Sequence, residues 1–167
     1  MNVNFSELES IKEVGFEGFR TVQSLFVDRK EIPKRRGVYL VLRIQDLPCQ
    51  YLELGTGGFF KGKDPNVPIV NLESNWVHGA KVLYIGKAGS LDGKATLHSR
   101  LNEYLKFGMG KNIGHWGGRL IWQLGDVPDL IVCWKSLPND DPRQVEKSLI
   151  RSFTSQFGKR PFANLVD

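Results

Sequence analysis

One acidic residue, Glu146, falls on a helical stripe that the sequence otherwise makes apolar. In the helix expected over residues 142–157, it shares its side with Ile150 and Phe153. A carboxylate on a core-facing side is costly to bury unless a cation or a metal ion satisfies it. Glu146 is therefore a candidate metal ligand, and the alternatives are a salt bridge to Arg100 or a position at the edge of the stripe. The opposite, solvated face of this helix is expected to carry Arg143, Lys147 and Arg151.

Arg100 occupies a similar position on an earlier helix. It lies between Leu97 and Tyr104, at the shoulder of the apolar stripe expected over residues 95–107. A partly buried arginine can direct its planar guanidinium at an anionic oxygen, so Arg100 is a candidate phosphate clamp. The alternative is an arginine that only packs its aliphatic stem.

The positive charge of the chain is concentrated in one stretch of the sequence. The net charge is +5, yet residues 1–80 carry ten basic and ten acidic side chains, and residues 120–167 carry six of each. The excess lies in residues 81–119, where seven cations accompany only two acids. Clustered cations are typical of a surface that binds a polyanion, because they neutralise phosphates, and a solvated helix face is the alternative. The seven are Lys81, Lys87, Lys94, Arg100, Lys106, Lys111 and Arg119.

The elements that must position these side chains can be predicted from apolar periodicity. Strands are expected over residues 37–44, 81–85, 120–124 and 130–134, with residues 37–44 central in the sheet. Helices are expected over residues 6–13, 95–107 and 142–157, and residues 19–26 fit either a strand or a short helix. The helix-end signals are a capping box of Ser6 and Glu9, then Asp141 with Pro142, and Gly158. This order predicts a single α/β domain over residues 1–167, in which helices cover a short sheet.

Two segments are expected to be additions to that domain. Residues 1–30 form an N-terminal extension, and residues 47–80 form an insertion, because glycine and proline break every period there. The insertion is expected to contain a small hairpin and a local core of Phe59, Phe60 and Trp76. It could shape a substrate groove, block one, or bind a protein partner.

The composition excludes several classes of protein. With 167 residues, 41% of them hydrophobic and 25% charged, the chain is neither low-complexity nor fully disordered. No apolar run approaches the ~20 residues of a membrane-spanning helix, and the start resembles no export signal, so we expect a cytoplasmic protein. Cys49 and Cys133 are too few for a disulfide framework and too far apart for a zinc pattern. Residues 55–60 and 86–88 lack the spacing of dinucleotide and phosphate-loop motifs.

Two tripeptides on neighbouring expected strands resemble the signature of the GIY-YIG nuclease family. They are Gly37-Val38-Tyr39 and Tyr84-Ile85-Gly86. The similarity covers about residues 35–46 and 80–167. Beyond the tripeptides, the matching residues are Lys87, Arg100, Tyr104, Glu146 and Asn164, each on the expected element.

The resemblance implies an α/β fold of the α+β type, with a small, mainly antiparallel sheet flanked by helices. It implies divalent-metal-dependent hydrolysis of nucleic-acid phosphodiesters, in the first place those of DNA. By similarity, Tyr39 is the general base or orients the attacking water, Tyr84 lines the scissile phosphate, and Arg100 stabilises charge on the phosphorus. Glu146 is the sole protein ligand of Mg²⁺ or Mn²⁺, which fits an ion that retains several waters. Lys87 lowers the pKa of the phenol or touches the phosphate, and Tyr104 and Asn164 complete the catalytic set, Asn164 by orienting its neighbours.

Further nucleic-acid contacts are expected around the glycine-rich loop of residues 108–118. Trp116 could stack on a base and Arg119 could contact a phosphate, whereas the alternative is a well-packed tryptophan in a turn. The whole expected binding set is Lys94, Lys106, Lys111, His115, Trp116 and Arg119.

The sequence departs from the family pattern in two ways. The signature halves are usually separated by a short hairpin, whereas residues 45–80 lie between them here. No recognisable DNA-binding module flanks the domain, so the substrate is not specified by an accessory domain.

Two other functions are compatible with the sequence. One is a non-catalytic nucleic-acid-binding module that retains the fold, although such a module has no need for Glu146 on a buried face. The other is a protein-interaction domain that uses residues 49–80, although the basic stretch contains Tyr84 and Arg100. We therefore expect a nuclease, with the binding module as the alternative.

Overall fold

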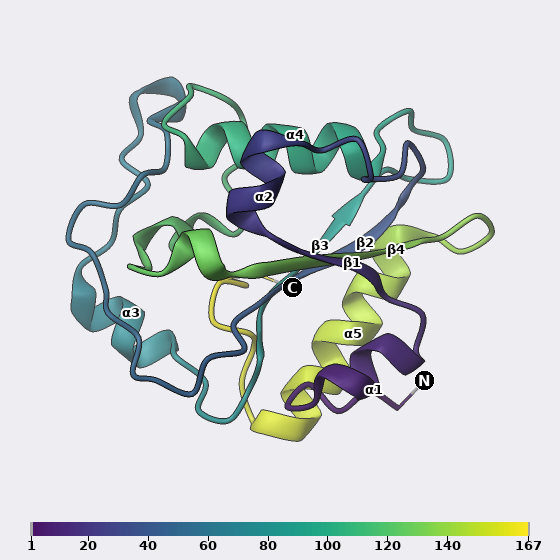
Figure 1. Ribbon diagram of the computed structural model, residues 1–167, viewed down its shortest axis with the longest axis horizontal. Helices are drawn as coiled ribbons and strands as arrows, with labels where there is room; N and C mark the ends of the chain where they lie inside the picture. Colours follow the sequence, from purple (N-terminus) through teal and green to yellow (C-terminus); the bar gives the residue numbers. More distant parts are fainter. Residues whose placement is uncertain (1, 167) are drawn as a thin grey trace.

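Four antiparallel strands form one sheet, and helices cover both of its faces (Figure 1). This α+β architecture, seen in a computed structural model that describes residues 2–166, confirms the predicted fold class. The strand order is β1-β4-β2-β3, so β2 is central and β3 lies at an edge. The strands are β1 (Glu17–Thr21), β2 (Gly37–Leu42), β3 (Val82–Ala88) and β4 (Ile131–Ser136).

The side chains of β2 alternate between two apolar cores. Tyr39 and Val41 belong to the core beneath α4, whereas Leu40 belongs to the core beneath α5. Because both faces of β2 are buried, its sequence is a continuous apolar run, and this is why it could be predicted as a central strand. α2 packs beside α4, α3 contributes Leu72 to the same core, and α1 lies beside α5. Their bounds are α1 (Leu8–Glu13), α2 (Val22–Val27), α3 (Ile69–Asn75), α4 (Leu97–Gly108) and α5 (Pro142–Phe157).

Most of the predicted helix ends are confirmed. The Asp141 side chain accepts a hydrogen bond from the backbone N–H of Arg143, and Gly158 ends α5 in the left-handed conformation. The predicted capping box of α1 is wrong, because the helix starts after Glu7 and has no side-chain cap. The turn before it uses Asn4 instead, whose side chain accepts from the backbone of Ser6.

Two predictions of strand structure are also wrong. Residues 120–123 lie in the 3₁₀ helix η2 (Arg119–Gln123) and Leu124 forms only an isolated bridge, since a short, buried run has no period that distinguishes strand from helix. The insertion over residues 47–80 contains no hairpin. Its regular elements are the 3₁₀ helix η1 (Phe60–Gly62) and α3, and its one bridge pairs Tyr51 with Leu124.

The insertion packs on the main core rather than around a core of its own. The buried Gln123 amide donates to the carbonyls of Leu52 and Val67 and accepts from the Val67 backbone N–H. Phe59 is exposed, and Trp76 packs edge-on against Phe162 from the chain's last segment. The expected local core is therefore absent.

Both ends of the described chain belong to the fold. β1 pairs with β4, so the segment expected to be an extension contributes a strand to the sheet. Phe162 and Ala163 are buried, as expected for a tail that packs back. No helix within residues 2–166 is long and apolar enough to cross a membrane.

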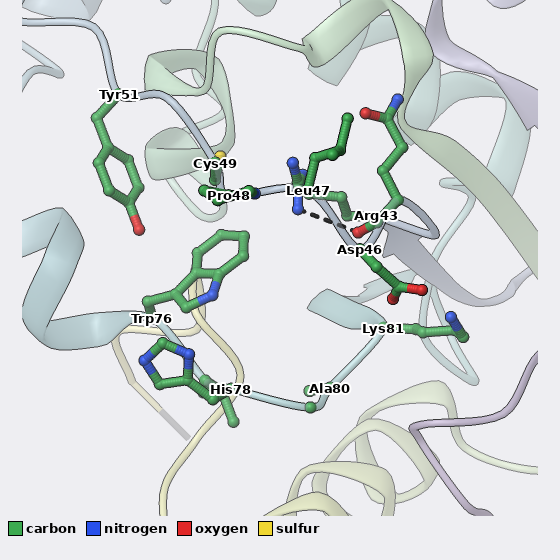
Figure 2. Close-up of a pocket in the computed structure, with 13 residues that line it drawn as sticks. Arg43, Asp46, Leu47, Pro48, Cys49, Tyr51, Trp76, His78, Ala80 and Lys81 are labelled. Atoms are coloured by element: carbon green, nitrogen blue, oxygen red, sulfur yellow. Dashed lines mark hydrogen bonds between the residues drawn. The ribbon is translucent and has the colours of Figure 1, made fainter.

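A cavity of about 440 Å³ lies where the insertion meets the ends of β2 and β3 (Figure 2). The Arg43 guanidinium lies 5.7 Å from the centre of the Trp76 ring and forms an ion pair with Asp126 at 2.7 Å. Tyr51 meets the same indole edge-on. Trp76 is therefore already engaged by Arg43, Tyr51 and Phe162, which favours a structural role over a base-stacking platform.

Candidate active site

A second cavity, of about 430 Å³, brings together most of the residues singled out from the sequence. Five of the seven expected catalytic residues line it, and they come from β2, β3, α4 and α5. We call this cavity the cleft. Its lining includes Tyr39, Tyr84, Lys87, Lys94, Arg100 and Glu146.

The strand register places the two tyrosines side by side. Tyr39 is paired with Gly86 across β2 and β3, and Val41 is paired with Tyr84. The two tyrosines therefore share one face of the sheet, and their rings meet edge-on with centroids 6.0 Å apart. A Cβ atom at Gly86 would lie 2.4 Å from Cζ of Tyr39, so the phenol ring needs a glycine beneath it.

The edge position of β3 explains how α4 and α5 reach the same cleft from opposite faces. Both helices pack on β3, and beyond this strand no further strand separates them. Arg100 approaches from α4 and Glu146 approaches from α5. Their charges act on a common neighbour: burial and the Glu146 carboxylate together raise the pKa of Tyr84 to about 12, and Arg100 opposes that rise.

Glu146 is half-buried and forms no hydrogen bond or ion pair with any residue in 2–166. The sequence left open a salt bridge to Arg100, but Arg100 is paired with Glu103 at 3.2 Å. Burial raises the pKa of the Glu146 carboxyl, and four cations, led by Lys87, oppose that rise. A half-buried carboxylate without a partner is suited to hold a cation.

The donor set fits a magnesium-like ion rather than zinc. The part of the chain that the structure describes holds no group of three or more His, Cys, Asp or Glu residues able to bind a metal. Mg²⁺ is commonly bound by one or two carboxylates together with substrate phosphates and water. Glu146 alone satisfies that requirement, and it does so in a cleft that also contains Arg100 and Lys87 for the phosphate.

His115 contacts the Tyr39 hydroxyl in the interior of the protein. The His115 Nε2 atom lies 3.3 Å from Oη of Tyr39, and Nδ1 lies 3.1 Å from the Gly117 carbonyl oxygen. A carbonyl can only accept, so Nδ1 carries the ring hydrogen and Nε2 accepts from the tyrosine. Burial, reinforced by Arg100, lowers the pKa of His115 to about 3, so the imidazole is neutral.

The prediction that His115 contacts nucleic acid is therefore wrong, since the side chain has no exposed surface. The glycine-rich loop carries it inward beneath the two tyrosines. Gly118 has a φ of 74°, and a Cβ there would lie 2.9 Å from the Tyr84 ring, so the loop can approach only as glycine. No periodicity in the sequence indicates this contact.

Tyr104 and Asn164 lie outside the cleft and support it. Tyr104 is buried, donates to the Gly118 carbonyl at 2.9 Å, and has its ring 4.5 Å from that of His115. Asn164 accepts from the backbone N–H of Ile85 and donates to its carbonyl, both at 2.9 Å. Its amide thus occupies the free edge of β3 as a further strand would.

The basic stretch of the sequence does not form one patch around the cleft. Lys94 lines the cleft, whereas Lys106 and Lys111 are exposed near the far end of α4. Arg119 is stacked on Trp116, with its guanidinium carbon 4.6 Å from the ring centre. Trp116 and Arg119 are each only half-buried, so this pair could meet a ligand, as could the exposed Lys111.

The cleft combines an unpaired carboxylate, three cations from different segments and a phenol joined to a neutral imidazole. Such a set can hold an anionic oxygen and a metal ion, and it can relay a proton between the phenol and the imidazole. No protein-family model, curated protein or solved structure matches this chain.

Proposed function

We propose that the protein is a divalent-metal-dependent endonuclease that hydrolyses nucleic-acid phosphodiesters, in the first place those of DNA. The observation that carries this proposal is the common cleft of Tyr39, Tyr84, Lys87, Arg100 and Glu146, residues that are far apart in the sequence. The resemblance to the GIY-YIG family, noted on these same residues, supports it.

The cations of the cleft bind and orient the phosphate. Arg100 is about one-third exposed at its side chain, so its guanidinium can exchange the weak pairing with Glu103 for a forked contact to phosphate oxygens. Lys87 and Lys94 add positive charge from β3 and from the loop that follows it. Groups held in advance where negative charge develops lower the barrier to phosphoryl transfer.

Tyr39 and His115 move the proton of the attacking water. Because burial raises its pKa, the Tyr39 phenol stays protonated and cannot act as a base by itself. Its hydroxyl, however, already donates to Nε2 of His115. As the water attacks phosphorus, its proton passes to Oη of Tyr39 and the original phenolic proton passes to Nε2. The phenol is thus neutral before and after the transfer, and His115 becomes the imidazolium. Burial opposes this charge most strongly, so the imidazolium is only transient, and a phosphate bound at Arg100 offsets the further repulsion from Arg100.

Glu146 holds the divalent ion, which when bound supplies charge stabilisation at the phosphate. Burial raises the pKa of Glu146 and four nearby cations lower it. The carboxylate lines the cleft without a competing partner. Of those cations, Lys87 lowers the pKa of Glu146 most, and it lines the same cleft as the residues that contact the phosphate.

Glu146→Gln tests the proposal, with Glu73→Gln on the exposed side of α3 as the matched control. Wild type and both variants are incubated with supercoiled, linear and branched DNA and with RNA, in Mg²⁺, Mn²⁺ or EDTA. We expect cleavage by wild type and the control in the metal ions only, and none by Glu146→Gln. Unchanged cleavage by Glu146→Gln would show that Glu146 does not hold the metal ion. If wild type binds nucleic acid but cleaves it in no metal ion, the protein is the non-catalytic binding module.

A second readout does not depend on activity. Mg²⁺ that binds the folded protein raises its unfolding temperature, in proportion to the logarithm of the ion concentration above the dissociation constant. Wild type and Glu73→Gln should show this increase, and Glu146→Gln should lose it.

A further inference from the structure

The two flanks of α5 differ sharply in charge. One flank faces the N-terminal segment, where Gln156 accepts from the Phe5 backbone N–H and donates to the side chain of Asn4. All the cations of α5 lie on the other flank, at intervals of four residues, and they are Arg143, Lys147 and Arg151. Residues four apart are neighbours on a helix surface, so these three form a continuous row.

A cavity of about 890 Å³ lies along this basic flank. Its lining contains four cations and no acidic or aromatic side chain: Lys147, Ile150, Arg151, Thr154, Ser155, Lys159 and Arg160. Lys159 donates to the Ser74 carbonyl and Arg160 donates to the Leu165 carbonyl. The inference therefore rests on Lys147 and Arg151, which form no hydrogen bond or ion pair within residues 2–166.

The basic flank begins at the cleft. Lys147 follows Glu146 directly in the sequence, and both Lys147 and Arg143 lower the pKa of the Glu146 carboxyl. From Arg143 to Arg151 the helix rises about 12 Å, which is the length of about three to four phosphates of one strand of duplex DNA. A backbone that enters the cleft can therefore continue along α5 without a gap in positive charge.

We propose that this basic flank of α5 binds the phosphate backbone of double-stranded nucleic acid that extends from the cleft. The inference rests on the proposed function, because it takes the cleft as the place where the strand is cut. The duplex follows from the lining: proteins that hold single strands use aromatic side chains on which bases stack, and the flank has none. A duplex keeps its bases stacked inside and presents only phosphates to such a surface.

The experiment compares two double variants that each remove two positive charges. Lys147→Gln with Arg151→Gln neutralises the basic flank, and Lys61→Gln with Lys63→Gln removes two exposed cations of the insertion. Binding of a fluorescent DNA duplex, and of one of its strands alone, is measured in EDTA from 50 to 200 mM salt. EDTA prevents metal-dependent cleavage, so the measurement reports binding only.

We expect the α5 variant to lower the salt slope for the duplex by about 1.8, or 0.9 for each lost phosphate contact. Between 50 and 200 mM salt, the ratio of wild-type to variant affinity should then shrink about 12-fold. The insertion variant should retain the wild-type slope, and the single strand should respond less than the duplex to the α5 changes. Arg151→Glu provides a single-site check, and thermal unfolding verifies that each variant is folded.

Equal slopes for wild type and the α5 variant overturn the inference, as does a larger loss for the single strand than for the duplex. Failure of the proposed function has a different signature. A protein that binds duplex through α5 but cuts nothing in any metal ion is a binding module with this surface intact. A protein that cuts DNA while its α5 variant binds normally is a nuclease that holds its substrate elsewhere.

Discussion

Tyr39 donates its phenolic hydrogen to Nε2 of His115 across 3.3 Å, and neither side chain has appreciable contact with solvent. The sequence placed Tyr39 on a central strand and His115 in a glycine-rich loop, with no sign that they meet. The Tyr39 hydroxyl supplies the hydrogen bond that the buried imidazole needs, and Tyr39 also lines the cleft. A change at this hydroxyl should therefore affect both the stability of the core and the proposed chemistry.

Tyr39→Phe should therefore reduce both activity and stability. Loss of an acid–base group typically costs at least about 10²-fold in rate. The change also leaves Nε2 of His115 buried without a donor, which costs about 1–3 kcal/mol rather than the smaller cost of one balanced hydrogen bond. Steady-state cleavage and urea unfolding measure the two effects. Tyr51→Phe, at the far end of the strands, is the control, and wild-type cleavage by Tyr39→Phe would remove the phenol from the mechanism.

His115 should make the protein sensitive to acid. Its pKa in the fold is about 3 and its ordinary value is ~6.5, so the unfolded chain takes up a proton that the folded protein refuses. The stabilisation from this group is complete above pH ~6.5 and is lost as the pH falls toward about 3. The free energy of unfolding, measured from pH 8 to 4, should decline less steeply for His115→Phe than for wild type. His78→Phe, at the surface, should follow the wild-type curve.

Arg100→Lys should impair cleavage although it keeps the charge. A lysine cannot offer two parallel N–H donors to phosphate oxygens, so we expect a loss of about 10-fold or more in rate with little change in DNA affinity. Lys106→Arg, on the same helix, is the reverse exchange at a position away from the cleft. Equal rates for wild type and Arg100→Lys would show that Arg100 packs its stem and does not clamp the phosphate.

Gly86→Ala should displace the Tyr39 ring. The new Cβ would lie 2.4 Å from Cζ, closer than real contacts allow, and the ring is enclosed by Tyr84 and His115. Overpacking of this kind costs about 1–3 kcal/mol of stability, and cleavage should fall with it. Ala80→Gly, at the other end of β3, controls for a general change at a small residue. Wild-type stability of Gly86→Ala would mean that the ring has room to move.

The parts of the fold with a clear period could be predicted from the sequence. α5 was placed by Asp141, Pro142 and Gly158, and β2 by a run of apolar residues between charged ones. Arg100 and Glu146 were found because each places a charged side chain on or beside an apolar helical stripe, and the two tyrosines were found because their tripeptides resemble the GIY-YIG signature. Their common cleft depends on β3 being the edge strand, which the order of elements does not specify.

Contacts made by irregular segments could not be predicted. His115 reaches Tyr39 through a loop whose glycines remove any period, and Gln123 binds the insertion from a 3₁₀ helix that resembles a strand in sequence. The row of Arg143, Lys147 and Arg151 on α5 was predicted from helical spacing, but a role for it in binding nucleic acid was not, because the charge count of this part of the chain is balanced. Residues 120–167 contain equal numbers of cations and acids.

Asn164 covers the open edge of β3, and this has a consequence for the order in which the molecule is made. During synthesis the ribosome releases β2 and β3 long before α5 and Asn164, so the edge of the sheet stays bare while the rest of the chain emerges. Throughout that interval a nascent chain exposes backbone donors and acceptors that a neighbouring nascent chain could pair with. It also lacks Glu146, the proposed metal ligand, so the proposed cutting activity must await the synthesis of α5.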